Sequence, residues 1–262
     1  QNYTTLFIAL RYLRGRKSGF LSFISALAFI STSLGVAVLI IVSSVMNGFE
    51  KELQERVLNV IPHASIYGIN PLDDWENIEL NLKDDINIKG ISPYIETEAL
   101  IKSKSAVAGV LVNGVEASKD KSVSVIHEFM QVGNFENIQE GNNIVLGRLL
   151  ARKLNVDLGD KISLMLPDTN SSFAGYFPRS KVFNVSGIFN IGSKDIDETL
   201  AYISLENASI LSGLNNQIHG FRLKFDDLFE APYLVWQSLI FAEKNSKVLL
   251  NAEDWSYTYG PL

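Results

Sequence analysis

The sequence predicts an α+β protein in which an N-terminal transmembrane helix with a helical stalk precedes a mixed α/β domain. Two observations lead to this prediction. Residues 18–49 are mostly apolar and carry no charge, and after Pro62 short strand and helix patterns follow one another through the 262-residue chain. A spanning helix needs only about 20 apolar residues, and roughly 200 further residues are enough for one or two ordinary cores.

The uncharged run is longer than a membrane requires. As a helix its 32 residues would reach about 48 Å at roughly 1.5 Å per residue, whereas the hydrocarbon core is about 30 Å thick. Arg11, Arg14, Arg16 and Lys17 precede it without an acidic neighbour, which predicts a cytoplasmic N-terminus, a span at 18–46 and an outer-side domain beyond Met46. A signal peptide cleaved near "SALA" is the competing interpretation, and the length of the run disfavours it.

The first 17 residues are apolar on one side, with Tyr3 and Tyr12 at headgroup depth and a basic end. This pattern predicts a short helix in the cytoplasmic membrane interface. The alternative is that the segment only lengthens the span.

Beyond the lipid, apolar residues continue at spacings of three and four on an otherwise charged helix: Met46, Phe49, Leu53, Val57 and Val60. We therefore expect a stalk helix at 47–61, ended by Pro62. The stripe either packs on its own domain or faces something that leaves the bilayer.

Within the span, small residues recur four apart: Ala28 with Thr32, Ser31 with Gly35, and Ser44 with Gly48. Such spacing lets a second helix approach closely in lipid, which favours helix packing at Ala28, Ser31, Thr32 and Gly35. A general tolerance of spanning helices for small residues is the alternative.

After Pro62 the elements are predicted from apolar alternation, helical periodicity and turn residues. Segment 167–178 is a loop by its Pro, Asp, Asn, Ser and Gly content. We expect strands at 63–68, 90–103, 106–116, 142–147, 161–167, 180–191, 200–205, 218–225 and 247–251. We expect helices at 73–82, 124–130, 148–156, 206–214 and 231–242.

Charge excludes some partners. The first 17 residues carry +4 and the chain carries −6, so residues 18–262 carry −10. A domain of this charge should bind neither nucleic acid nor anionic lipid headgroups. The chain has no cysteine, so disulfides do not hold the fold together.

The sequence shows no catalytic or cofactor-binding set. His63, His127 and His219 are far apart and fit structural or surface positions, and there is no phosphate-binding loop. Asp195 and Asp197 with Glu198 fit a solvated hairpin turn better than a calcium loop. We therefore expect no enzyme activity, no metal and no cofactor.

Several segments together identify a family. "LFIALRYLRGRK" and "SLGVAVLIIVSSVMNGFEKELQERVLNVIPHASI" closely resemble the LolC/LolE lipoprotein-releasing membrane subunits, which belong to the MacB/FtsX-type ABC transporter permeases. The resemblance continues through "VNGV", "IVLGRLLARKLNVDLGDKISLMLP" and "DWSYTYG". "VNGV", "IPHASI" and "TYG" look more like the LolE type than the LolC type.

The resemblance implies a bacterial inner-membrane protein with four spans and a large periplasmic domain between the first two, of which this chain would be an N-terminal fragment. It implies a second LolC/LolE-type subunit, a dimer of a cytoplasmic LolD-type ATPase, triacylated lipoproteins and a periplasmic LolA-type carrier as partners. A cell-division or efflux-type permease domain is the runner-up, and a single-span receptor or anchored enzyme is a further alternative.

The resemblance also implies functional residues. The lipoprotein cavity would be lined by Val42, Met46, Phe49 and Leu53. A carrier-binding hook would lie between Pro167 and Pro178, followed by a polar and basic pad, which gives the candidate carrier contacts Phe173, Tyr176, Phe177, Ser180 and Lys181. The three aromatic residues fit either an exposed partner site or a local cap.

For the domain, the resemblance implies two lobes. A porter-like lobe would contain 62–115 and 216–256, and a sabre-like lobe, 116–215, would be inserted between them. Residues 257–262 would approach the second span.

Overall fold

The computed structural model describes residue 11 and residues 19–166, 179–246 and 248–259. The chain divides into two compact units, 1–54 and 55–262. The first helix, α2 (Gly19–Val60), is continuous across this division, and its Phe23–Gly48 part is long and apolar enough to span a membrane. The prediction of one continuous helix that ends before Pro62 is therefore confirmed, whereas the limits of the span at 18–46 and of the stalk at 47–61 stay predictions.

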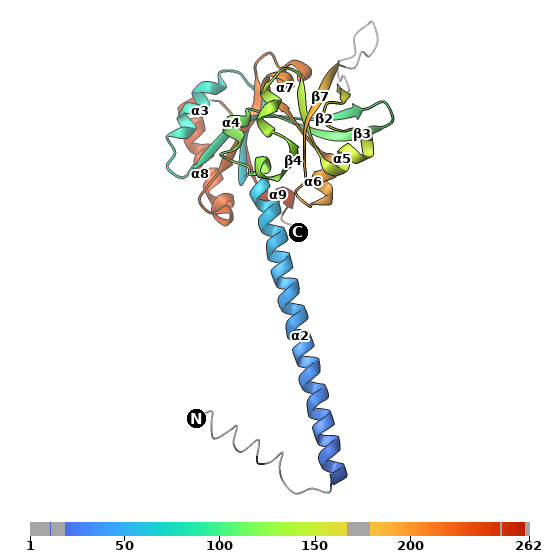
Figure 1. Cartoon of the computed structure of the whole chain (residues 1–262). Coiled ribbons are helices and arrows are strands. Elements are labelled where there is room, and N and C mark those ends of the chain that lie inside the picture. Colours follow the sequence, from blue (N-terminus) through green and yellow to red (C-terminus); the bar gives the residue numbers. More distant parts are fainter. Residues whose placement is uncertain (1–10, 12–18, 167–178, 247, 260–262) are drawn as a thin grey trace. The chain divides into compact units, whose positions relative to one another are not determined.

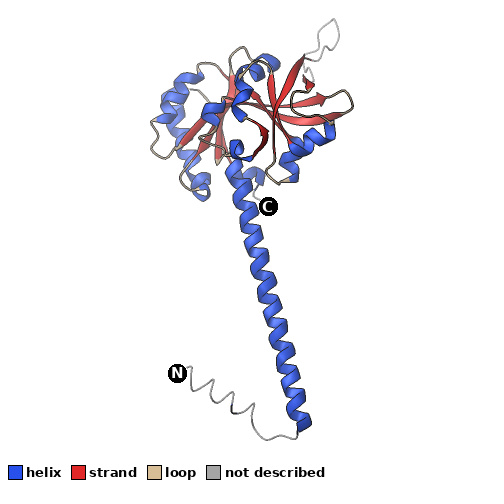
Figure 2. Ribbon diagram, viewed as in Figure 1, coloured by secondary structure: helices blue, strands red, loops and turns tan. Residues whose placement is uncertain are grey.

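The second unit contains the β-structure (Figure 2). Alternating apolar and polar residues form most of these strands, as the sequence predicts. They are β1 (Ala64–Leu72), β2 (Gly90–Lys102), β3 (Val107–Val115), β4 (Met130–Gly133), β5 (Asn143–Gly147), β6 (Lys161–Leu166), β7 (Arg179–Phe189), β8 (Leu200–Ser204), β9 (Ile218–Lys224) and β10 (Leu250–Asp254).

The helices of this unit are mostly short. The α-helices are α3 (Trp75–Lys83), α4 (Ala117–Asp120), α5 (Arg148–Leu154), α6 (Lys194–Thr199), α7 (Leu205–Ser212), α8 (Ala231–Ser246) and α9 (Trp255–Tyr259). The 3₁₀ helices are η1 (Ile126–Phe129), η2 (Phe135–Gln139) and η3 (Leu228–Glu230). In Figure 1, α3 and α8 lie side by side at one end of the sheet, where they contact each other.

The strands form one hydrogen-bonded sheet in the order β10-β1-β9-β2-β3-β8-β5-β7-β4. Strand β6 pairs with both β2 and β7, so β2, β3, β8, β5, β7 and β6 close into a ring. Strand β2 serves two parts of the sheet: residues 90–94 pair with β9 and residues 100–102 pair with β6. The strands β9, β1 and β10 therefore extend from the ring as an open arm.

Alternate residues of the ring strands fill one buried apolar cluster. The members on the ring strands are Ile91, Ile95, Ala99, Ile101, Ala108, Val110, Val112, Ile144, Leu146, Ile162, Leu164, Phe183, Val185, Ala201 and Ile203. The period of two along each strand is the one expected where successive side chains point to opposite faces. The same cluster continues through α3 and α8, which cover the arm at Ile66, Phe221 and Leu223.

Gly114 of the "VNGV" segment is needed for close packing. A Cβ built there would lie 2.1 Å from the Cβ of Ala208 on α7. Strand β3 can therefore approach this helix only with glycine at this position.

A second buried cluster lies on the opposite face of the ring strands. Val145 and Tyr202 belong to it, together with the helical segments α4, η1, η2 and α6. Phe135 and Phe189 each pack edge-on against the ring of Tyr202. Val60, the last residue of α2, is only 2% exposed and joins this cluster.

Several expectations about this unit need revision. The strand expected at 247–251 begins at Leu250 and runs to Asp254, where it pairs with β1. The sequence analysis missed β4, α4 and η2, which have too few residues to show a periodic pattern. The coarse α+β architecture is confirmed. The porter-like and sabre-like division is not confirmed, because residues 55–262 form one compact unit, and its boundaries stay a prediction.

The hairpin turn expected around Asp195, Asp197 and Glu198 was wrong. These residues form α6, and Asp197 is buried. Its carboxylate accepts hydrogen bonds from the backbone N–H groups of Ile191 at 2.9 Å and of Gly192 at 3.0 Å. The carboxylate therefore satisfies the backbone of the bend between β7 and α6, a role that local composition did not reveal.

We expect Asp197→Asn to destabilise the second unit by about 1.5 to 3 kcal/mol, because an amide can accept only one of the two hydrogen bonds and turns its NH₂ toward the other N–H. Urea unfolding followed by tryptophan fluorescence measures this, since Trp75, Trp236 and Trp255 all lie in this unit. Asp195→Asn, an exposed change on the same helix, is the matched control and should leave stability unchanged. Equal unfolding midpoints for both variants would contradict the capping role.

Candidate functional site

The apolar stripe of α2 has two environments. The side chains of Val42 and Met46 are 53% and 60% exposed, whereas Val60 is buried in the second apolar cluster. The side chains of Phe49 and Leu53 lie outside the described residues, although both positions belong to α2. Val60, the last residue of the stripe, therefore packs within the second unit, whereas the side chain of Met46 is exposed.

The small residues of the span are also exposed. Ala28, Ser31, Thr32 and Gly35 lie on a helical stretch of which none is buried within the structure. The Thr32 hydroxyl donates to the Ala28 carbonyl at 2.9 Å, and a Cβ at Gly35 would meet no atom within 4 Å. The surface is available for another helix, so helix packing at these positions stays a prediction.

The predicted carrier loop connects two paired strands. Leu166 lies opposite Arg179 and Met165 opposite Ser180, so β6 and β7 form an antiparallel hairpin around residues 167–178. Phe173, Tyr176 and Phe177 lie outside the described residues. The Arg179 guanidinium donates to the Ser212 carbonyl at 2.6 Å, which ties the base of the hairpin to the end of α7.

The two pad residues point to opposite faces of β7. Ser180 is exposed, whereas Lys181 is partly buried, donates to the Asn207 side-chain oxygen at 2.6 Å and lies 5.8 Å from the Phe183 ring centroid. Neighbouring strand residues alternate between faces. The structure therefore does not bring Ser180 and Lys181 together on one surface.

Two of the histidines act as hydrogen-bond acceptors in the fold. His63 Nδ1 accepts from the Phe225 N–H at 3.3 Å, and His219 Nδ1 accepts from the Glu96 N–H at 3.2 Å. Burial lowers the pKa of His63 to about 4 and lowers the pKa of His219. Both rings are therefore neutral near pH 7 and structural, as predicted. In the described part of the chain, no group of His, Cys, Asp and Glu side chains is arranged to hold a metal.

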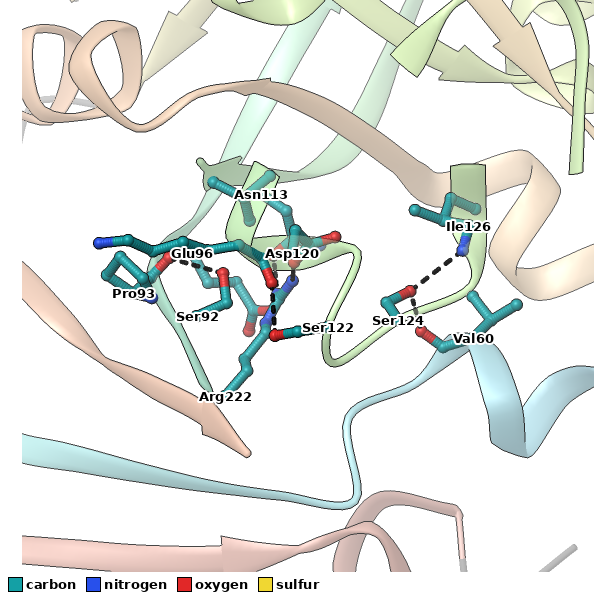
Figure 3. A network of polar contacts seen from close by, with 12 residues as sticks. Val60, Ser92, Pro93, Glu96, Asn113, Asp120, Ser122, Ser124, Ile126 and Arg222 are labelled. Carbon is teal, nitrogen blue, oxygen red and sulfur yellow. Dashed lines mark hydrogen bonds and ion pairs between the residues drawn. The ribbon is translucent and has the colours of Figure 1, made fainter. Parts of the chain in front are cut away.

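Arg222, a buried cation in the second unit, was not predicted from the sequence. Arg222 on β9 donates to the Asn113 side chain, pairs with Glu96 at 3.4 Å and lies 5.0 Å from the Tyr94 ring centroid (Figure 3). Its guanidinium also lies 3.8 Å from the Asp120 carboxylate. The only sequence signal was a lone arginine within the apolar strand "IHGFRLKF".

Asp120 belongs to a chain of contacts that reaches the end of α2. Its carbonyl accepts from the Ser124 N–H at 2.9 Å, and the Ser124 hydroxyl donates to the Val60 carbonyl at 2.6 Å (Figure 3). The Asp120 side chain is fully buried and its oxygens accept no hydrogen bond in the described structure. Burial raises the pKa of this carboxyl to about 6, and nearby Arg222 opposes the rise.

Residues 25–228 match the MacB-like periplasmic core domain family. Over 257 residues the chain is 37% identical to the lipoprotein-releasing system transmembrane protein LolC of Neisseria meningitidis serogroup B, covering 96% of this chain and 60% of that protein. It is 35% identical over 238 residues to LolE of Haemophilus influenzae, covering 88% and 57%. The chain thus spans somewhat more than half the length of these relatives, and the two types match about equally well.

A solved structure is similar in fold. The extracellular domain of the noncanonic ABC-type transporter YknZ from Gram-positive bacteria matches with a TM-score of 0.50 at 12% identity. The match covers 72% of this chain and 98% of that domain.

We expect the contribution of Asp120 to the stability of the second unit to fall as pH rises from about 4 to 6, by an amount on the order of 3 kcal/mol. A folded-state pKa of about 6 against 3.8 when unfolded means that the folded state holds the Asp120 proton more tightly in this window. Asp120→Asn should remove this contribution. The measurement is the unfolding free energy of the wild type minus that of the variant, followed from about pH 4 to pH 6. If this difference stays constant or rises with pH, the effect of Arg222 on the pKa of Asp120 outweighs the effect of burial.

Proposed function

The chain belongs to the LolC/LolE family of the MacB-like superfamily, and we propose that it contributes the first span and the periplasmic domain of a membrane subunit in a lipoprotein-releasing ABC-type complex. The complex extracts lipoproteins destined for the outer membrane from the inner membrane and passes them to a periplasmic carrier. The observation that carries this proposal is the identity to relatives named for lipoprotein release over nearly the whole chain, α2 included. It favours this function over a cell-division or efflux permease.

In this proposal α2 forms one wall of the lipoprotein cavity. Val42 and Met46 offer exposed apolar side chains at the end of the spanning stretch. Phe49 and Leu53 continue the same stripe by helical spacing. An acyl chain is stabilised by about 0.8 kcal/mol for each buried methylene group, so an apolar wall suits a lipid that leaves the bilayer.

The remaining parts of the complex follow from the family. We propose a second LolC/LolE-type subunit that packs on Ala28, Ser31, Thr32 and Gly35, a LolD-type ATPase dimer that hydrolyses ATP in the cytoplasm, and no catalysis by this chain. The four basic residues before the span favour the proposed orientation, with the N-terminus in the cytoplasm and the domain in the periplasm. The β6–β7 hairpin is the proposed contact for a LolA-type carrier.

Met46→Asp in the full-length subunit should lower the triacylated lipoprotein that copurifies with the assembled complex by at least about tenfold. An unpaired carboxylate costs several kcal/mol where it must lie against an acyl chain. Because Met46 is largely exposed, the change should not lower the amount of subunit in the membrane. Lipoprotein is quantified per assembled complex.

Ser44→Asp is the matched control. Ser44 is exposed. It lies about 3 Å from Met46 along the helix axis and is rotated by about 200° around that axis. The charge of Ser44→Asp is therefore introduced at nearly the same depth but on the opposite face of the helix. This variant should retain lipoprotein. Equal losses in the two variants would show a general effect of charge in α2 and would contradict a lipoprotein wall at Met46.

A photo-crosslinker at Ser180 should capture the carrier in cells, because this exposed residue lies at the base of the proposed carrier hairpin. The same probe at Lys194, which is exposed on α6, controls for random collision. Crosslinkers at Phe173, Tyr176 and Phe177 extend the test into the loop. Carrier adducts at Lys194 with none at Ser180 or in the loop would assign carrier binding to another surface.

A further inference from the structure

A cavity of about 240 Å³ lies on the face of the sheet that carries Arg222. One wall is the end of α2 and the residues that follow it, Val60, Ile61 and Pro62, and Leu111 and Leu200 add further apolar surface. All of these residues belong to the second unit. The volume is that of about eight water molecules at about 30 Å³ each, which suits one long side chain and excludes a folded segment.

Carboxylates dominate the polar lining of the cavity: Glu96, Asp195, Glu253 and Asp254. The one cationic group in the lining, Arg222, is already committed to Glu96, Asn113 and Asp120. Asp254 accepts from the Ser256 N–H at 2.9 Å and caps α9. The cavity therefore holds more negative charge than its own cation balances.

Asp195 and Glu253 are the lining carboxylates for which the described structure shows no side-chain partner, and of the two only Glu253 is partly buried. Burial raises the pKa of Glu253, and the neighbouring Glu96 and Asp254 raise it further. A cation placed here would relieve both the desolvation and the repulsion.

The lining already holds one cationic side chain, that of Arg222, and the contacts of Arg222 show which groups stabilise a cation here. Ser65 lies opposite Glu253 on β10 and opposite Arg222 on β9, so Glu253 and Arg222 stand in one row on the same face of the arm. The Arg222 guanidinium sits over the Tyr94 ring and beside Glu96. Trp255 also belongs to the lining, but its indole N–H donates to the Leu228 carbonyl at 2.9 Å and its ring packs against Phe229, so the Tyr94 ring is the aromatic surface that contacts a cation here.

We propose that this cavity binds the side chain of an arginine or lysine, with the cationic group at Glu253 and the aliphatic stem against the apolar wall. The occupant belongs to the polypeptide that follows the lipidated residue of a lipoprotein, and in this respect the inference rests on the proposed function. The helix that provides the proposed lipid wall ends at this cavity, so a polypeptide attached to that lipid is the segment that reaches it.

The test uses synthetic triacylated lipopeptides and the full-length assembled complex in lipid nanodiscs. Arginine, glutamine or glutamate is placed at successive positions after the lipidated residue. At one position the wild-type complex should bind the arginine peptide roughly tenfold more tightly than the glutamine peptide, the size expected for a charged hydrogen bond. The glutamate peptide should bind more weakly than both.

Two variants and a control assign the preference to the cavity. Glu253→Gln should remove the preference for arginine without changing the affinity for the glutamine peptide, and Glu253→Lys should invert the preference in favour of glutamate. Glu98→Gln changes an exposed carboxylate on β2, two residues from Glu96 and outside the lining, and should leave the preference intact. Tryptophan fluorescence on heating checks that each variant is folded.

The outcomes separate the two proposals. If no lipopeptide binds the wild-type complex, the proposed function fails and the inference fails with it. If all three peptides bind equally at every position, or if Glu253→Gln leaves the arginine preference unchanged, lipoprotein binding stands and the cavity assignment is wrong. If Glu253→Gln lowers only the copurifying phosphatidylethanolamine, the cavity holds an ammonium lipid headgroup and the inference is likewise overturned.

Discussion

The closure of the strand ring by β6 is the constraint on which the rest of the second unit depends. This short strand pairs with the end of β2 on one side and with β7 on the other, so it joins two strands that are far apart in the sheet order. Closure removes the free edges that β2 and β7 would otherwise present there. It also fixes the base of the β6–β7 hairpin, which makes the proposed carrier loop an extension of the ring.

Strand β2 connects the ring to the open arm because its two halves pair with different strands. The face of the arm that packs on α3 and α8 is apolar, and the opposite face carries Arg222 and Glu253. Taking a guanidinium out of water costs several kcal/mol unless its hydrogen bonds are replaced. Asn113, Glu96 and the Tyr94 ring provide this replacement from β2 and β3. These contacts of Arg222 form only when β9 of the arm pairs with β2 of the ring in the observed register.

The end of α2 is held by the same region. Val60 is buried among ring and helix residues, and its carbonyl accepts from Ser124 four residues beyond the buried Asp120. A displacement at the end of α2 would have to alter this hydrogen bond or carry the loop between α4 and η1 with it. The end of α2 is thus linked to the buried Asp120 and Arg222 through a short series of contacts within the second unit.

Elements with a strong periodic or compositional signal could be predicted from the amino-acid sequence. The uncharged run and Pro62 set the limits of α2, and alternation in "GISPYIETEALIKS" and "AVAGVLVNGVE" predicted β2 and β3. The family resemblance also came from the sequence, above all from "LFIALRYLRGRK" and "SLGVAVLIIVSSVMNGFEKELQERVLNVIPHASI", because a resemblance of this kind depends on residue identity and not on the fold. The candidate residues Val42 and Met46 came from that resemblance, and the structure adds that they are exposed.

Features that depend on contacts between residues distant in the chain became visible only in the folded domain. Periodicity gives the face of a strand but not its neighbour, so the double pairing of β2 and the closure by β6 could not be derived from the sequence. The same reason explains Arg222, whose partners lie more than 100 residues away. Asp197 accepts hydrogen bonds from backbone groups only five and six residues away, but local composition placed it in a solvated turn because it did not reveal the burial of this carboxylate. The burial of a charged group is set by the segments that surround it, and those segments come together only in the folded domain.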